Sequence, residues 1–200
     1  MTFPDFKTWV QDVLHPRDLA TGRGPYCFET EAWYQVYRNK HRIAEALRPL
    51  SVLEIGVRYG YAAHAFLTAC SVITYVGVDV DDPVINAMGE PTCAWAMEML
   101  SRTTPARVLR GLIKVNTRTT DIRSLLPNRT FDLTHIDADH TFAGALDDIT
   151  KAWELTSGAM LVDDYFGSPP VRDAVDRFVS TSGALLVTSP SGTGEALLLK

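Results

Sequence analysis

Short apolar runs of strand length alternate with amphipathic segments along most of this chain. We expect strands at Ser51–Ile55, Thr74–Val80, Leu112–Val115, Phe131–Asp137 and Ala159–Asp163. We expect helices between and after them at Tyr61–Cys70, Pro91–Ser101, Asp121–Leu126, Thr141–Thr156 and Val171–Val179. This order predicts a Rossmann-like doubly wound α/β fold, in which helices cover both faces of a mostly parallel sheet.

The amino-terminal part of the chain lacks this alternation. Residues 1–30 indicate a short helix followed by irregular chain. Glu31–Leu47 has good helix formers with apolar residues at helical spacing, and Pro49 ends the helix. We therefore expect residues 1–48 to form a helical cap segment and residues 49–200 to form the main domain.

The carboxyl-terminal part allows several local predictions. The last two apolar runs, Ala184–Thr188 and Ala196–Leu199, flank the turn-forming sequence SPSGTGE. They predict a hairpin that adds an antiparallel strand at one edge of the sheet. Gly158 stands where a helix C-cap is expected. Asp147 and Asp148 are expected on the polar face of the preceding helix.

Two glycines follow the first predicted strand and indicate a cofactor turn. Gly56 and Gly60 form a GxxxG spacing, and the dinucleotide fingerprint GxGxxG is absent, which argues against NAD. Glu54 precedes the turn, where a carboxylate repels a pyrophosphate but suits an amine or a water. Asp79 ends the second strand, 23 positions after Gly56, and suits a ribose diol. The alternative is a simple tight turn beside a solvated strand end.

Acidic residues follow two neighbouring strands. Asp137 and Asp139 come after one strand, and Asp163 and Asp164 after the next. Neighbouring strands lie about 4.8 Å apart, so these carboxylates are close enough to share one divalent cation. The alternatives are solvated strand-end acids and a helix cap at Asp139 or Thr141.

The pattern E-x-G-x-x-x-G that begins at Glu54, followed by the strand that ends in Asp79, resembles motif I and its successor in class I S-adenosylmethionine-dependent methyltransferases. The resemblance extends from about residue 50 to the end of the chain, and the terminal hairpin agrees with the reversed strand of that family. It implies that Glu54, Gly56 and Gly60 surround the methionine part of the cofactor and that Asp79 binds its ribose. It also places Asp121 near the adenine, although Asp121 is equally plausible as a helix N-cap.

The sequences IDADHTF and LVDDY resemble a narrower group, the metal-dependent O-methyltransferases related to macrolide and aminocoumarin sugar O-methyltransferases. That resemblance implies Mg²⁺ ligands at Asp137, Asp163 and Asp164. The Asp-Asp pair, in place of the Asp-Asn of catechol-type relatives, favours the sugar-modifying branch. A hydroxyl polarised by Mg²⁺ deprotonates more easily. His140 is the leading candidate for the base and Asp139 is its rival.

Composition excludes several other classes of protein. The net charge of -5 offers no basic stripe for nucleic acid. No run approaches the roughly 20 apolar residues that span a bilayer, and early charges at Asp5 and Lys7 do not fit a signal peptide. The cysteines Cys27, Cys70 and Cys93 are too scattered for a disulfide framework. We expect a cytoplasmic protein.

The expected function is therefore Mg²⁺-assisted O-methylation of a small hydroxylated metabolite or a natural-product sugar. Two alternatives stay open: a metal-independent N- or O-methyltransferase and a non-catalytic cofactor-binding subunit. Arg23–Phe28 is expected to be a lid, Asp81–Glu90 a loop near the ribose, and Phe166–Ser168 a wall of the acceptor pocket. His135 is expected to be a core histidine, while His140 has the alternative role of bonding a loop carbonyl. A homodimer is possible.

Overall fold

The structure, a computed structural model, describes residues 2–20, 30–69, 71–85, 89–189 and 193–200. Its strands are β1 (Ser51–Ile55), β2 (Thr74–Asp79), β3 (Leu109–Lys114), β4 (Phe131–Ile136), β5 (Thr156–Val162), β6 (Leu185–Ser189) and β7 (Glu195–Leu199). Its helices are α1 (Phe6–Asp12), α2 (Pro16–Ala20), α3 (Glu31–Leu47), α4 (Tyr61–Thr68), α5 (Cys93–Thr103), α6 (Ile122–Leu125), α7 (Phe142–Glu154) and α8 (Pro169–Ser182). In the described part of the chain, no helix is long and apolar enough to cross a membrane.

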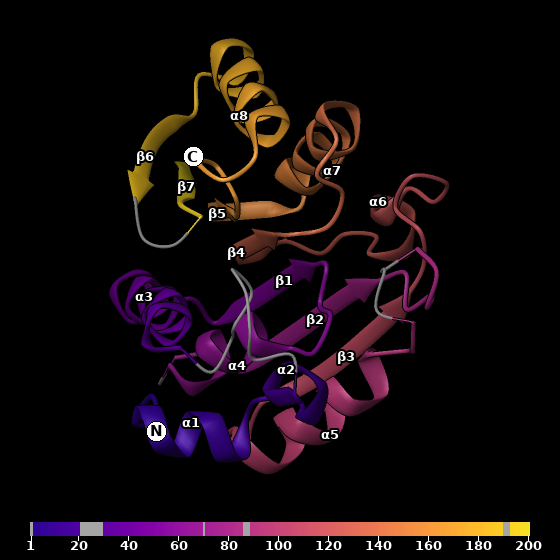
Figure 1. Cartoon of the computed structure of the whole chain (residues 1–200). Coiled ribbons are helices and arrows are strands. Elements are labelled where there is room, and N and C mark those ends of the chain that lie inside the picture. The colour runs from indigo at the N-terminus through magenta and orange to yellow at the C-terminus, as the bar shows by residue number, and fades with distance from the viewer. Residues whose placement is uncertain (1, 21–29, 70, 86–88, 190–192) are drawn as a thin grey trace.

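The strands form a seven-stranded sheet in the order β3-β2-β1-β4-β5-β7-β6 (Figure 1). Strands β1 to β5 pair in parallel, and β7 runs antiparallel to both β5 and β6. The predicted Rossmann-like sheet with a reversed strand from a terminal hairpin is thus confirmed. The strand order reverses between β1 and β4, which is where open α/β sheets bind ligands.

Alternating residues of the strands build two cores. Val52 and Tyr75 pack with residues of α1, α3, α4 and α5 on one face of the sheet. Leu53 and Val76 pack with residues of α6, α7 and α8 on the other face, and Figure 1 shows these helices on opposite sides. Successive strand side chains point to opposite faces. Burying each such side chain contributes roughly 1.5–3 kcal/mol to stability.

Some predicted boundaries hold and others shift. Helix α3 and strand β1 have the predicted bounds, whereas the short helix α2 replaces part of the predicted irregular chain. The predicted helix C-cap at Gly158 is wrong, because α7 ends at Glu154 with Leu155 as its C-cap and Gly158 lies inside β5. A Cβ at Gly158 would lie 2.6 Å from the carbonyl oxygen of Asp132. The absence of a side chain at Gly158 therefore allows β4 and β5 to approach closely at this point.

The prediction for the two acids of α7 is half wrong. Asp147 is partly exposed and pairs with Lys151 at 2.6 Å, as a polar helix face requires. Asp148 is fully buried, and neither carboxylate oxygen has a hydrogen-bond partner in the described part of the chain. Burial disfavours the charged carboxylate and raises the pKa of Asp148 to about 6.

The turn after β1 touches the chain that leaves β4. Gly56 has φ +90°, and a Cβ on it would lie 1.9 Å from the carbonyl oxygen of Asp137. The Asp137 N–H in turn donates to the carbonyl of Ile55 at 2.8 Å. Only glycine combines this left-handed backbone conformation with the absence of a side chain.

Replacing Gly56 with alanine should destabilise the protein far more than the same change at Gly183. Gly183 also has a positive φ of +73°, but no atom lies within 4 Å of an added Cβ. We expect Gly183→Ala to cost roughly 1 kcal/mol from backbone strain, and Gly56→Ala to cost about 3 kcal/mol or more. Urea unfolding of both variants measures the difference. Equal losses would show that the Gly56 contact is relaxed in solution.

Replacing Asp148 with asparagine should stabilise the protein at neutral pH. A carboxyl whose pKa rises from 3.8 to about 6 on folding contributes stability that is full below pH 3.8 and is lost as the pH rises through 6. The loss amounts to roughly 3 kcal/mol. The free energy of unfolding, measured with urea from pH 4 to pH 7.5, should favour Asp148→Asn increasingly over the wild type.

Asp147→Asn is the matched control for that experiment, because it removes a neighbouring carboxylate that is paired with Lys151. This control should not gain stability over the wild type as the pH rises. A gain for Asp148→Asn that does not change with pH would contradict the interpretation.

Candidate functional site

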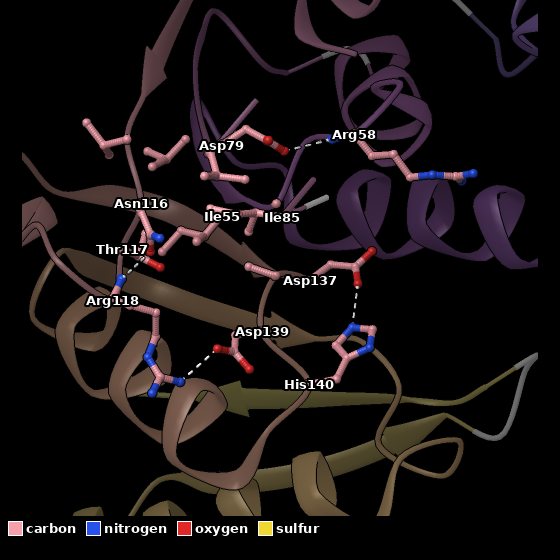
Figure 2. A pocket seen from close by; sticks show the side chains of 15 residues that line it. Ile55, Arg58, Asp79, Ile85, Asn116, Thr117, Arg118, Asp137, Asp139 and His140 are labelled. Carbon is pink, nitrogen blue, oxygen red and sulfur yellow. Dashed lines mark hydrogen bonds and ion pairs between the residues drawn. The ribbon is translucent and has the colours of Figure 1, made fainter. Parts of the chain in front are cut away.

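One cavity of about 530 Å³ opens at the carboxyl ends of the central strands (Figure 2). It lies where the strand order reverses, between β1 and β4. Its walls come from the segments that follow four neighbouring strands, and Ile85 adds an apolar side chain from the loop predicted near the ribose. The lining residues from those segments are Gly56, Arg58, Asp79, Val80, Val115–Arg118 and Asp137–His140.

Asp79 ties the glycine turn to the end of β2. Its Oδ2 accepts hydrogen bonds from the backbone N–H groups of Val57 at 2.7 Å and Arg58 at 2.9 Å. Its Oδ1 accepts from the N–H of Asp81 at 2.7 Å. Each carboxylate oxygen carries two lone pairs, so Asp79 keeps accepting capacity toward the cavity that it lines.

Gly60 begins α4 at the other end of the turn, with φ +77°. A Cβ there would lie 3.1 Å from the Cβ of Ala96 in α5. Gly60 therefore lets α4 start close against α5, and it is not among the cavity-lining residues. A contact of Gly60 with a cofactor stays a prediction.

Glu54 lies beneath the turn and away from the cavity wall. It is buried, with its Oε2 accepting from the Tyr75 hydroxyl and its Oε1 at 3.2 Å from Nδ1 of His135. Burial raises the pKa of Glu54. His135 is fully buried, which confirms the prediction of a core histidine. The predicted contact of Glu54 with a cofactor amine stays a prediction, since its carboxylate already has two protein partners.

Asp121 forms the N-cap of α6, the alternative that the sequence left open. Its carboxylate accepts from the N–H of Arg123 at 3.0 Å and from the Arg123 guanidinium. These bonds lower the pKa of Asp121 to about 2. The cavity wall on this side includes Asn116, Thr117 and Arg118, which were not among the predicted site residues. Their position directly after the third parallel strand was the available signal.

His140 lies between two of the predicted metal-binding acids. Its Nε2 is 3.3 Å from Oδ1 of Asp137 and 3.3 Å from Oδ2 of Asp164. The hydrogen bond to Asp137 and the nearby carboxylate charges raise the pKa of His140 to about 9. Burial opposes the ionisation of Asp137, yet the bond from His140 and the charges around it lower the Asp137 pKa to about 2.

Asp163, the third predicted ligand, is held by a buried lysine. Nζ of Lys40 in α3 is 3.0 Å from Oδ2 of Asp163 and 2.8 Å from Oε1 of Glu195. Burial alone would lower the pKa of Lys40, but Asp163 and Glu195 outweigh it and hold that pKa above its usual range. The signal missed in the sequence is that Lys40 stands four residues from Val36 and from Ala44, both on the buried face of α3.

The side-chain ligand atoms at this end of the cavity suit a divalent cation. Among the described residues, two groups offer ligand atoms within 4.8 Å of one another: His135 with Asp137 and Asp163, and Asp137 with His140 and Asp164. Carboxylate oxygens are the protein ligands that Mg²⁺ prefers. Nε2 of His135 is also buried without a hydrogen-bond partner in the described part of the chain.

Asp139, the rival candidate for the base, has both carboxylate oxygens engaged. Its Oδ2 lies 2.7 Å from Nη1 of Arg118 (Figure 2). Its Oδ1 accepts from the N–H of Thr141 at 2.8 Å. Thr141 caps α7 by accepting from the N–H of Gly144. His140 and Asp139 both line the cavity, but the His140 side chain is half exposed. The geometry therefore favours His140 as the group that exchanges a proton.

The predicted walls of the site are only partly described. The expected lid at Arg23–Phe28 lies outside the described residues. The N–H groups of Phe166 and Gly167 bind the carbonyl of Thr193, and these residues are not part of the cavity wall. Their contact with an acceptor stays a prediction.

Comparison with protein families gives one match that covers more than half of the chain. The family described as "Methyltransferase domain" matches residues 53–165. This span begins inside β1 and includes the turn, Asp79, His140 and the acids that follow β4 and β5. No curated protein sequence matches the chain.

Solved structures with the same fold are numerous. An S-adenosylhomocysteine-bound methyltransferase from Podospora anserina, PaMTH1, has TM-score 0.69 and 17% identity and covers 98% of this chain and 88% of its own. An O-methyltransferase from Bacillus cereus in complex with S-adenosylhomocysteine has TM-score 0.64 and 14% identity, with 98% and 100% covered. CalS11, a TDP-rhamnose 3'-O-methyltransferase of calicheamicin biosynthesis, has TM-score 0.63 and 14% identity, with 97% and 91% covered. At these identities the likeness concerns the fold.

Proposed function

We propose that this chain, which belongs to the methyltransferase-domain family and has the class I S-adenosylmethionine-dependent fold, methylates a hydroxyl of a small metabolite with the assistance of Mg²⁺. The observation that carries the proposal is that one cavity is lined both by Asp79 and Gly56 and by Asp137 and His140. A natural-product sugar is the acceptor class we favour, because the pair Asp163-Asp164 resembles the sugar-modifying branch. The name of CalS11, a protein of similar fold, agrees with this choice.

The Asp79 side of the cavity is proposed to bind the methyl donor. S-adenosylmethionine supplies a methyl carbon on a positively charged sulfur, which leaves as a neutral thioether when an oxygen attacks. The remaining lone pair of Asp79, on Oδ1, suits a ribose hydroxyl. Gly56 and Gly60 let the turn pass close to the ligand, and Glu54 supports that turn from below through Tyr75. Asn116 and Thr117, which line the cavity, are proposed to contact the adenine.

The His140 side is proposed to bind the acceptor. A divalent cation lowers the pKa of a bound hydroxyl, and the acids after β4 and β5 are its proposed ligands: Asp137, Asp164 and the neighbouring Asp163. The hydrogen bond to Asp137 and the charges of Asp137 and Asp164 hold the His140 pKa at about 9, and a cation bound to these acids would offset those charges and lower that pKa. The neutral imidazole of His140 would then receive the hydroxyl proton, because Asp139 is already bound to Arg118 and Thr141. The fixed walls hold the oxygen in line with the methyl carbon, which is where most of the rate gain arises.

Cofactor binding should depend on Asp79 and not on Asp121. We expect Asp79→Ala to weaken S-adenosylhomocysteine binding by on the order of tenfold or more, since lost hydrogen bonds to a carboxylate are worth roughly 1.5–3 kcal/mol. Asp121→Ala should change the affinity less than twofold, because that carboxylate binds Arg123 outside the cavity. Isothermal titration calorimetry on folded variants measures both. A larger loss for Asp121→Ala would restore it as the adenine contact.

Methyl transfer should require both a divalent cation and Asp137. Formation of S-adenosylhomocysteine, followed over a panel of nucleotide sugars, glycosides and catechols, should stop with EDTA and recover with Mg²⁺. We expect Asp137→Ala to lower kcat/KM by roughly a hundredfold or more. Asp173→Ala, which removes an exposed acid of α8, is the matched control and should retain the rate.

Survival of the activity in EDTA and in Asp137→Ala would favour a metal-independent methyltransferase. Tight binding of S-adenosylhomocysteine without transfer to any acceptor of the panel would favour a non-catalytic cofactor-binding subunit.

A further inference from the structure

Lys40 joins three parts of the chain that are distant in sequence. It lies on the buried face of α3 and is completely inaccessible to solvent. Its partners are Asp163, directly after β5, and Glu195, the first residue of β7. The antiparallel pairing of Val162 with Ala196 places those two acids side by side. One ammonium group therefore lies between two carboxylates at the edge of the site.

The carboxylate oxygens of Asp163 are both engaged within the protein. Oδ2 pairs with Nζ of Lys40 at 3.0 Å, and Oδ1 accepts from the N–H of Asp164 at 3.1 Å. Turning Asp163 toward another cation would leave Lys40 with Glu195 alone. Separating a buried ion pair costs more than the pair contributes, because each charge then lacks compensation in a medium of low dielectric constant.

Asp137 and Asp164 have a different environment. In the part of the chain that the structure describes, the basic side chain within 4 Å of them is that of His140, which is half exposed and lines the cavity. Their own side chains are 36% and 21% exposed, against 13% for Asp163. A hydrated cation entering from the cavity therefore reaches Asp137 and Asp164 without breaking a buried ion pair.

We propose that Lys40 is a positioning residue that holds Asp163 away from the divalent cation, so that Asp137 and Asp164 are the carboxylate ligands. Lys40 acts as a permanent counter-charge that neutralises part of the acidic cluster and limits its affinity for divalent cations. The inference rests on the metal-binding part of the proposed function. It divides the three predicted ligands into two that coordinate the cation, Asp137 and Asp164, and one, Asp163, that Lys40 holds away from it.

Binding of Mn²⁺, a spectroscopic probe for the Mg²⁺ site, tests this assignment without measuring activity. Electron paramagnetic resonance of free Mn²⁺ gives its dissociation constant for the full-length protein. In the wild-type background, Asp163→Asn should change that constant less than threefold, whereas Asp164→Asn should raise it by on the order of tenfold or more. Lys40→Met should tighten Mn²⁺ binding by on the order of tenfold, because it removes a nearby positive charge and frees Asp163.

The double variant Lys40→Met/Asp163→Asn completes a double-mutant cycle, which isolates the interaction between the two residues. A general loss of stability would not produce the pattern of affinities that we expect from this cycle. In the Lys40→Met background, Asp163→Asn should reverse the gain in affinity. Since Lys40→Met leaves Glu195 buried without a partner, Lys40→Met/Glu195→Gln is the second route to a folded protein with a free Asp163. Lys200→Met is the control for the loss of one lysine, because Lys200 binds the Thr156 carbonyl at the opposite end of β5.

The outcomes separate this inference from the proposed function. If Asp163→Asn weakens Mn²⁺ binding in the wild-type background as much as Asp164→Asn does, the inference is overturned and the metal site stands. If the wild type does not bind Mn²⁺ but the folded Lys40 variants do, the role of Lys40 in limiting the affinity is supported, while the assignment of Asp137 and Asp164 as wild-type ligands and the proposed Mg²⁺ assistance are both overturned. Unchanged affinity in folded Lys40 variants, or no binding to any of them, overturns the inference.

Discussion

The backbone of Gly56 lies against the carbonyl of Asp137, with no room for a Cβ between them. This contact joins the turn after β1 to the end of β4, at the point where the strand order reverses. The turn carries the proposed donor-binding side of the cavity, and Asp137 begins the acidic side. A methyl donor and its acceptor must be held within about 0.5 Å of reactive geometry. A steric contact between two backbones fixes that spacing more firmly than flexible side chains do.

The distribution of charge follows from how each carboxylate is partnered. Buried charges are tolerated only when they are paired or hydrogen-bonded. Glu54 meets this requirement through Tyr75 and His135 beneath the turn, and Asp163 meets it through Lys40. Among the described residues, the basic partner of Asp137 and Asp164 within 4 Å is the partly exposed His140. The acids with permanent internal partners support the site, and the two without them remain available to a ligand.

The sequence predicted those features that depend on local pattern. Apolar runs identified the parallel strands, and the rule that ligands bind at the carboxyl ends of strands selected Asp79 and Asp137. The sequence did not predict the burial of Asp148, because helical spacing alone does not show whether a neighbouring segment covers that face of the helix. Gly158 was misread for a similar reason. A helix cap and a close strand crossing both favour glycine, and only the position of Asp132 distinguishes them.

Lys40 is the clearest example of a residue of the site that sequence motifs do not identify. The family match covers residues 53–165 and therefore includes all three predicted metal-binding acids. Lys40 and Glu195, which decide the surroundings of one of those acids, lie on either side of that span. Two sites with the same acidic motif can therefore have different ligand sets, because the counter-charge comes from segments that the motif does not contain. A lysine at a buried helix position is a better guide to such a difference than the acids themselves, since its charge must find a partner inside the protein.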